Sequence, residues 1–411
     1  MPGPGMEWIG EEEKQALLEV IEAGYLFRYG DPANPAFKAK VYQLEQEVAK
    51  LSKVPYAVAV NSGTSALLVA LGGLGIGPGD EVIVPGYTFI ASMSSIIYAR
   101  AIPILAEVDR SLNLDPQDVR KKITPRTKAI MAVHMLGNPA KLDELKTIAD
   151  EHNLLLIEDC AQAFGASYKG KPIGSIGHAG TFSFNVYKTI TAGDGGMVIT
   201  SNQEYYRRFF GFHDQGHSPN RTGVEVGNRP FVGLDFRMTE LTAAVLLAQL
   251  SKLDRLMKTL RAKKGYFKKA LMDIPGLEFR EITDEAGECA TLCTVFLPTE
   301  EIARKVAKEL NTKVVADSGW HVYNNMEQIL EKRTITPEGC PYTCPYYKGG
   351  EVKYDKGMLP QTDALLNRAI NLSVGVIDPG LGSAFGISFN DEDSLIDQKA
   401  AQFRSVVQKY L

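Results

Sequence analysis

The sequence predicts an α/β protein built on a buried, mostly parallel sheet. Seven short apolar runs alternate with helical windows between residues 56 and 200. Their apolarity is continuous rather than alternating, which is typical of strands covered by helices on both faces. At 411 residues the chain is also too long for one small core, so we expect two domains.

The elements of the larger domain can be placed in order along the chain. Apolar positions recur at helical spacing in residues 10–23, which end at Gly24, and residues 36–52 form a second helical window. The expected strands are residues 56–60, 81–85, 102–108, 128–135, 154–159, 180–184 and 196–200. A long helical stretch, apolar early and basic late, then covers residues 237–271.

Beyond Pro275 the pattern is that of a smaller C-terminal α+β domain. We expect a strand in 290–298, a helix in 299–310, an irregular section rich in Gly, Pro and Tyr from 317 to 360, a strand around 382–389 and a helix in 391–411. Long helices of this kind commonly link domains. We therefore assign residues 1–255, with the N-terminal helical segment, to the large domain and residues 256–411 to the small one.

Composition excludes several classes of function. A net charge of −4 gives no general attraction for nucleic acid or anionic membrane. No apolar run approaches the length of a membrane span, and the acidic N-terminus is unlike a signal peptide, so we expect a cytoplasmic protein. Five cysteines do not form a disulfide framework, and Cys340 and Cys344 lack the partners of a zinc site. His213 and His217 also lack a completing acid cluster, so we expect no metal.

The stretch from Asp159 to Gly196 contains the candidate catalytic pair. Asp159 ends an apolar strand, and Lys188 lies between two strands in a segment nearly free of charge. A lysine that forms a Schiff base and an acid that keeps the pyridine nitrogen protonated are what pyridoxal 5′-phosphate requires. In general, a lysine is more often solvated than catalytic, and a strand-end acid can simply cap a helix. Burial would favour the catalytic interpretation, because it lowers the pKa of an amine.

A phosphate site is indicated between the first strand and the following helix. In the run NSGTSAL (61–67), Gly63 permits close approach of the backbone, and Thr64 and Ser65 offer hydroxyl groups beside a helix N-terminus. Ser183, near the lysine, is a further candidate ligand. The alternative is a plain helix cap, for which Ser and Thr are well suited.

Other residues can hold the ring of the cofactor. Phe89 is the preferred stacking residue and Tyr87 the second choice, although aromatic residues at strand ends are mostly core. Ala161 is small enough to lie under a ring, and Gln162 can reach the ring hydroxyl.

Taken together and in this order, the motifs carry a family resemblance. They are SGTSAL, GDEVIVPGYTFIAS, PRTKAI, VHMLG, IEDCAQAFGASYKG, FSFNVYKTITAGDGGMVIT and GLDFRMTELTAA. The chain resembles the DegT/StrS-type sugar aminotransferases of the fold type I pyridoxal phosphate enzymes. The resemblance implies a seven-stranded, mostly parallel sheet between helices, with Lys188 as the Schiff-base lysine and Asp159 as the pyridinium partner. It also implies a homodimer with shared active sites, to which the second subunit contributes the segment around Asp235.

The chain departs from the family pattern at two acids. Asp235 replaces the usual Asn, and an acid near a phosphate is repulsive; Asp194 replaces the usual glutamate before the paired glycines. Lys188 is retained, which argues against the relatives that carry histidine there and remove a hydroxyl group. A pyridoxal-dependent dehydratase and a non-catalytic cofactor-binding regulator are the alternatives of another class.

The expected reaction moves an amino group from glutamate or glutamine to a keto or aldehyde sugar. Within the family, the chain is most similar to the 8-amino-3,8-dideoxy-manno-octulosonate transaminases, through FRYG (27–30), HDQGH (213–217) and WHVYNN (320–325). A nucleotide-linked 4-keto or 3-keto deoxysugar is the alternative acceptor. The candidate substrate residues are Arg28, Tyr87, Asn185, His217, Arg229 and His321.

Overall fold

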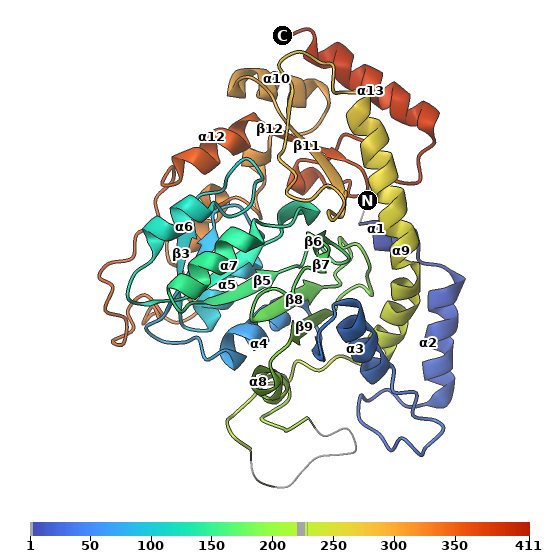
Figure 1. The fold of residues 1–411 in the computed structure, drawn as a ribbon, viewed down its shortest axis with the longest axis vertical. Helices are drawn as coiled ribbons and strands as arrows, with labels where there is room; N and C mark the ends of the chain where they lie inside the picture. Colours follow the sequence, from blue (N-terminus) through green and yellow to red (C-terminus); the bar gives the residue numbers. More distant parts are fainter. Residues whose placement is uncertain (1–2, 220–226, 228) are drawn as a thin grey trace.

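A computed structural model describes residues 3–219, 227 and 229–411, and Figure 1 shows its fold. The expected α/β architecture is confirmed, with a seven-stranded sheet enclosed by helices. Part of the polar loop expected to be functional, residues 220–223 of 211–223, lies outside the described residues.

The large sheet contains all seven strands that the sequence predicted. They are β1 (Tyr56–Val60), β2 (Glu81–Pro85), β3 (Ile102–Ala106), β4 (Thr127–Val133), β5 (Leu155–Asp159), β8 (Ala179–Ser183) and β9 (Gly196–Thr200). Their spatial order is β1-β9-β8-β5-β4-β2-β3. The pairings of β9 with β1 and with β8 are antiparallel, and the other pairings are parallel. The sheet is therefore mostly parallel, as expected.

Each strand sends alternate side chains into two separate cores. In β1, Ala57 and Ala59 join one core, whereas Val58 and Val60 join the other. Helices α3 (Lys40–Leu51), α6 (Pro116–Lys122), α7 (Leu142–Glu151) and part of α9 (Glu240–Lys269) cover the first face. Helices α4 (Gly63–Gly73), α5 (Ile90–Tyr98) and α8 (Gln203–His213) cover the second. Burial on both faces explains why the strands read as continuous apolar runs.

A smaller three-stranded antiparallel sheet forms the C-terminal part. Its order is β10 (Glu278–Phe279), β11 (Leu292–Phe296) and β12 (Ala369–Ser373). Helices α10 (Glu300–Glu309) and α13 (Asp393–Val407) pack in the core of this part, and α12 (Pro360–Arg368) leads into β12. Helix α9 extends along one side of the molecule from α3 to α13 (Figure 1). It contributes to the cores of both parts, so the domain boundary at residue 255 stays a prediction.

The last expected strand is wrong. Residues 382–389 are largely irregular, and the strand lies at β12 instead. Gly382 has φ 74° and Gly386 has φ 142°, values that interrupt an extended strand, and an isolated bridge between Ser373 and Gly386 takes the place of a continuous ladder with β12. The apolar residues of 382–389 led to the wrong prediction, because they pack in the same core as β12 without forming a strand.

The remaining elements are short or terminal. They are α1 (Pro4–Glu7), α2 (Glu11–Ala23), β6 (Ser167–Tyr168), β7 (Lys171–Pro172), α11 (Glu327–Leu330) and the 3₁₀ helices η1 (Met135–Gly137), η2 (Val315–Asp317), η3 (Tyr323–Asn325) and η4 (Pro379–Leu381). Among the described residues, no helix combines the length and apolarity needed to cross a bilayer.

One irregular stretch is attached to the large sheet by backbone hydrogen bonds. The amide groups of Thr88 and Ile90 donate to the carbonyls of His321 (2.9 Å) and Trp320 (3.0 Å), and the amide of Tyr323 donates to Gly86 (3.0 Å). The start of the section rich in Gly, Pro and Tyr therefore lies along the loop after β2. This placement brings residues 320 and 321 to the edge of the sheet where the parallel strands end.

Candidate active site

A cavity of about 550 Å³ lies at the carboxyl ends of the parallel strands. Ligand sites of α/β sheets commonly lie at this edge, because strand-to-helix loops converge there. Asp159 and Ser183 are the last residues of β5 and β8, and Gly63 begins α4 after β1. The cavity therefore gathers residues from loops that are far apart in the sequence.

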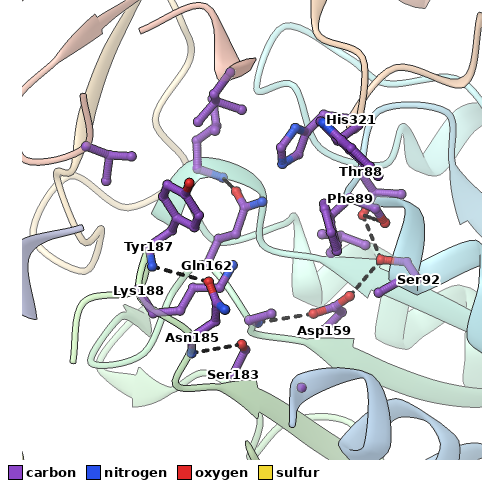
Figure 2. Close-up of a pocket in the computed structure, with 18 of the residues that line it drawn as sticks. Thr88, Phe89, Ser92, Asp159, Gln162, Ser183, Asn185, Tyr187, Lys188 and His321 are labelled. Atoms are coloured by element: carbon purple, nitrogen blue, oxygen red, sulfur yellow. Dashed lines mark hydrogen bonds between the residues drawn. The ribbon is translucent and has the colours of Figure 1, made fainter. Parts of the chain in front are cut away.

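Lys188 projects into this cavity, as Figure 2 shows. It follows a turn in which its backbone amide donates to the carbonyl of Asn185 (2.9 Å). Burial lowers the pKa of the Lys188 amine, and the nearby Asp159 carboxylate opposes part of this effect. Within the described part of the chain, the Lys188 ammonium has no hydrogen bond or ion pair. A buried amine of this kind is more readily neutral, and a neutral amine can act as a nucleophile.

The Asp159 carboxylate is buried and held by two donors. The backbone amide of Ala161 donates to Oδ1 (3.1 Å), and the hydroxyl of Ser92 donates to Oδ2 (2.7 Å). Asp159 is 4% exposed, and no cation within the described residues forms an ion pair with it. A buried carboxylate without a countercharge is costly, so a cationic ring nitrogen is a fitting partner.

The N-terminus of α4 and the end of β8 form the polar end of the cavity. Gly63, Thr64 and Ser183 line it. A Cβ atom on Gly63 would lie 2.6 Å from the Cβ of Ser183, so only glycine permits this close packing. Ser65 is placed differently from our expectation, because its hydroxyl is turned away and donates to Asn61 Oδ1 (2.6 Å). Its side chain is therefore not a phosphate ligand in this arrangement.

Residues expected to contact a ring also line the cavity. Phe89, Ala161 and Gln162 are all part of its wall. The carbonyl oxygen of the Gln162 side chain accepts from the amide of Leu136 (2.9 Å), which leaves its NH₂ group as the donor available to a ligand. Phe89 is 40% exposed, as a side chain at the cavity surface should be.

His321 and Trp320 also line the cavity. The rings of His321 and Phe89 lie 5.4 Å apart at a 50° tilt, and His321 Nδ1 lies 3.1 Å from Ser318 Oγ. Burial, with a smaller contribution from the Lys188 charge, lowers the pKa of His321 to about 3. The imidazole is therefore neutral at physiological pH and can accept or donate hydrogen bonds without carrying charge.

Two candidate substrate residues lie outside the cavity and are corrected here. Arg28 is buried, and its guanidinium forms an ion pair with Glu45 (2.8 Å) and contacts His213 (3.0 Å). Its charge is already neutralised, so it does not serve a substrate carboxylate. Tyr87 is fully buried in a core that joins the two parts of the molecule. The core alternative was therefore right for Tyr87, whereas Phe89 is the aromatic residue at the cavity.

The cavity of one chain does not include three further candidates. His217 and Arg229 contact each other (Nδ1 to Nη2, 3.4 Å) away from the cavity wall. Asp235 forms an ion pair with Arg237 (2.6 Å), which also pairs with Asp214 (2.5 Å). Because Arg237 is shared between the two carboxylates, it offsets only part of their combined negative charge. Of the remaining candidates, Asn185 does line the cavity, where its side-chain NH₂ donates to Asp194 (3.1 Å).

Several lining residues had not been singled out from the sequence. Ser92 and Thr88 lie within the quoted run GYTFIAS, and Trp320 lies within WHVYNN, so a signal was present for them. Other lining residues within the quoted motifs had been given no role: Ser62, Leu67, Ala91, Val133, Leu136, Tyr187 and Thr189. The lining residues outside these motifs are Thr291, Leu292, Val376, Asp378, Gly380 and Leu381. Those from 291 onward come from the C-terminal part, whose approach to the sheet no local pattern predicts.

The donor set fits pyridoxal phosphate. Lys188 supplies an amine and Asp159 a buried carboxylate, neither in an ion pair with a described residue, and the start of α4 with Ser183 supplies hydroxyl and amide donors for a phosphate. Phe89 and Ala161 offer apolar surface for a flat ring. Each part of the cofactor thus has a chemically matched residue in one cavity.

A second group of titratable residues lies beneath the cavity and is structural. His134, Glu158 and Cys160 are buried close together. Glu158 accepts hydrogen bonds from the amides of Gly174 (2.6 Å), Ile176 (2.8 Å) and Gly177 (2.6 Å). His134 Nδ1 accepts from the amide of Ala140 (2.9 Å), which leaves Nε2–H to donate to Glu158 (3.1 Å). Both imidazole nitrogens are thereby used, so this group is not arranged to bind a metal.

Comparisons with known proteins agree with this site. Residues 7–376 match the model of the DegT/DnrJ/EryC1/StrS aminotransferase family. A GDP-perosamine synthase of Caulobacter vibrioides is 43% identical over 260 residues, 63% of this chain and 67% of that protein. An L-glutamine:2-deoxy-scyllo-inosose aminotransferase of Streptoalloteichus tenebrarius is 38% identical over 282 residues, 64% of this chain and 66% of that protein.

The structure of a 3-amino-5-hydroxybenzoic acid synthase superposes with a TM-score of 0.77 at 26% identity. The match covers 98% of this chain and 97% of that one. The predictions of fold type I, of a sugar aminotransferase and of pyridoxal phosphate dependence are confirmed. The chain belongs to the DegT/DnrJ/EryC1/StrS aminotransferase family.

Proposed function

We propose that this enzyme transfers an amino group from glutamate or glutamine to the keto or aldehyde carbon of a sugar, with Lys188 and Asp159 at the centre of the site. One observation carries the assignment of residues. Lys188 is a buried amine of lowered pKa in the same cavity as the buried Asp159 carboxylate. This combination supplies both the base and the charge partner that transamination requires.

Each residue has a defined task in the proposed reaction. When bound, pyridoxal phosphate supplies a ring that withdraws electrons from the reacting carbon. Asp159 holds a proton on the ring nitrogen, which keeps the ring electron-withdrawing. In the first half-reaction, Lys188 Nζ would take a proton from the α-carbon of the amino donor and deliver it to the cofactor carbon that keeps the amine. In the second half-reaction it would move a proton from that carbon to the sugar carbon that receives the amine. The lowered pKa makes a neutral amine available for both tasks.

Cofactor binding is assigned to residues at the two ends of the cavity. The backbone amides of Gly63 and Thr64, with the hydroxyls of Thr64 and Ser183, hold the phosphate. Gln162 donates to the ring hydroxyl, and Phe89 and Ala161 pack on the ring. The support is that all these residues line one cavity and that the Gln162 side chain has its NH₂ group free to donate.

A nucleotide-linked keto sugar is the first candidate acceptor. The relative from Caulobacter vibrioides with 43% identity is named for a GDP sugar. The described lining contains acids at 194 and 378, and Lys188 is its only basic residue apart from His321, which is neutral at physiological pH. Acids accept hydrogen bonds from sugar hydroxyls but repel a carboxylate. A neutral sugar ring inside the cavity, with its charged nucleotide outside, fits this lining.

The C8 aldehyde of a 3-deoxy-octulosonate sugar acid is the second candidate acceptor. Its specific support is that the WHVYNN stretch brings Trp320 and His321 into the cavity wall. Of the other suggestive motifs, FRYG carries Arg28, which is buried in an ion pair elsewhere. A sugar acid would therefore need its cation from another subunit.

We infer a homodimer in which each cavity is completed by the second subunit. The carboxylates of glutamate and the cofactor phosphate both need positive or donor groups, and the described lining offers few. Asp235, Arg229 and His217 lie outside the cavity of their own chain and are the candidates to reach the other one. The pairing of Asp235 with Arg237, which also pairs with Asp214, reduces the repulsion that Asp235 would meet near a phosphate. A cytoplasmic location remains a prediction.

The decisive experiment is an absorption spectrum of the purified enzyme with pyridoxal phosphate, before and after addition of glutamate or glutamine. We expect a change of the cofactor spectrum and release of the corresponding keto acid, followed by reversal with the right sugar. A panel of nucleotide-linked keto sugars and sugar-acid aldehydes then identifies the acceptor. A dehydratase would release no keto acid from glutamate, and a binding protein would show cofactor absorption without turnover. Either result would overturn the proposed reaction.

A further inference from the structure

We propose that Ser92, supported by Thr88, is a positioning residue that fixes the Asp159 carboxylate toward the ring nitrogen of the cofactor. This inference rests on the proposed function, since it assumes that Asp159 meets that nitrogen. The two hydroxyl side chains and the carboxylate form a continuous chain of hydrogen bonds, which Figure 2 shows.

The direction of the hydrogen bonds follows from chemistry. A carboxylate only accepts, so the Ser92 hydroxyl must donate to Asp159 Oδ2 (2.7 Å). The single proton of Ser92 is thereby used, so Thr88 Oγ1 must donate to Ser92 Oγ (2.7 Å). The order is therefore Thr88 to Ser92 to Asp159. A donor that itself accepts a hydrogen bond is polarised and becomes a stronger donor.

Burial makes this chain energetically significant. Thr88 and Ser92 are each 1% exposed and Asp159 is 4% exposed. Water therefore has little access to replace a lost donor. A hydrogen bond to a charged group stabilises a protein more than a hydrogen bond between neutral groups. With Ser92 on Oδ2 and the Ala161 amide on Oδ1, both oxygens are oriented and the carboxylate cannot rotate freely.

The chain is anchored at its far end by the C-terminal part. The backbone amide of Thr88 donates to the carbonyl of His321 (2.9 Å), whose ring forms part of the cavity wall. Ser92 lies one turn further on, within the first turn of α5. The segment that brings His321 to the cavity thus also fixes the backbone from which the two hydroxyls project.

Loss of the Ser92 donor is expected to shift the absorption titration of the lysine-bound cofactor in one direction, to higher pH. Without the Ser92 donor, the carboxylate becomes more basic and takes a larger share of the proton on the ring nitrogen. The ring then carries less positive charge. The nitrogen that joins Lys188 to the cofactor therefore holds its own proton to higher pH. The pH midpoint of the absorption of the lysine-bound cofactor should therefore rise, and the cofactor should leave faster.

The test compares the holoenzyme with Ser92→Ala and Thr88→Val. Ser92→Ala is expected to raise the midpoint of the absorption titration and to speed cofactor dissociation about tenfold, the lower limit for losing a hydrogen bond to a charge. Thr88→Val, which keeps the shape of the side chain, should shift both quantities in the same direction by less. Thr88→Ser should restore the wild-type values, because it keeps the hydroxyl.

Ser95→Ala is the matched control. Ser95 is equally buried on the same helix, but its hydroxyl donates to the backbone carbonyl of Ser92 (3.1 Å) rather than to Asp159. Its titration midpoint should match that of the wild type. Equal midpoints in Ser92→Ala, Thr88→Val and Ser95→Ala would overturn the proposal, as would an equal shift in all three. If Ser92→Ala does not fold, the pair Thr88→Val and Thr88→Ser decides the question alone. If the wild type itself forms no such absorption band, the proposed function fails rather than the role of Ser92.

Discussion

Lys188 and Asp159 line the same cavity, yet within the described residues neither side chain forms an ion pair. Instead, burial lowers the pKa of the amine, while Ser92 and the Ala161 amide hold the carboxylate. A direct ion pair would keep the lysine protonated and unreactive. The separation of the two groups therefore leaves each of them available to a ligand that lies between them.

Replacement of Lys188 by alanine tests the first of these groups. We expect Lys188→Ala to lose the absorption band of the lysine-bound cofactor and to reduce kcat by about 10²–10⁴-fold, because the general base is removed. Absorption spectra and the release of keto acid from glutamate measure the two effects. Lys128→Ala, which removes an exposed lysine of β4, serves as the control. Full activity in Lys188→Ala would refute the assignment.

Replacement of Asp159 by asparagine tests the second group. Asparagine keeps the size of the side chain but removes the negative charge that holds a proton on the ring nitrogen. We expect Asp159→Asn to retain some cofactor and to lose about a hundredfold in kcat, the scale on which loss of one preorganised electrostatic partner acts. Equilibrium binding of the cofactor and steady-state kinetics separate the two effects. An unchanged rate would remove the proposed role of Asp159.

The pairing of Arg28 with Glu45 gives a prediction about stability. The two side chains are 0% and 1% exposed, so Arg28→Ala removes the cation that pairs with the buried Glu45 carboxylate. We expect the free energy of unfolding to fall by about 3–5 kcal/mol. The control is Arg120→Ala, because Arg120 pairs with Glu151 on the surface and its loss should cost about 0–1 kcal/mol. Denaturant unfolding measures the free energy of unfolding of both variants. Similar decreases in the two would show that burial of the Arg28–Glu45 pair adds nothing to its effect on stability.

The sequence could single out Lys188 and Asp159 as the candidate catalytic pair, because the signals for both residues are local. Asp159 ends an apolar strand, and Lys188 lies in a segment with few charges, so sequence neighbours alone describe their surroundings. Arg28 was assigned wrongly for the opposite reason. Arg28 lies in the segment between α2 and α3, its partner Glu45 is on α3, and nothing in the sequence shows that the two side chains meet in the interior. A free cation and a neutralised one look identical in a sequence.

Residues of the C-terminal part could not be assigned to the cavity from local sequence patterns. Asp378 reaches the cavity from the loop after β12, a strand that the sequence interpretation displaced to residues 382–389. Thr291 comes from the start of the neighbouring strand. Their positions depend on how the small sheet packs against the large one, and that contact joins residues more than a hundred positions apart. Ser92, in contrast, lay within a motif already noted, but its hydrogen bond to Asp159 required coordinates.

The lowered pKa of His321 predicts that the stability of the fold depends on pH. Its pKa is lowered from 6.5 to about 3, so between these values the unfolded chain binds a proton at this ring that the folded protein does not bind. Stability therefore falls as the pH decreases from 6.5 toward 3, by up to about 1.4 kcal/mol per pH unit from this group.

The variant His321→Asn should lack this contribution. We expect the stability difference between pH 7 and pH 5 to be smaller in His321→Asn than in the wild type, as measured by denaturant unfolding of the cofactor-free protein. His152→Asn is the control, because His152 is exposed and its replacement should leave the wild-type pH dependence intact. The same pH dependence in all three proteins would show that the His321 ring takes up its proton as readily in the folded state as in the unfolded chain. The imidazole would then be charged in weakly acidic solution, and its place as a neutral hydrogen-bonding group in the cavity wall would have to be abandoned.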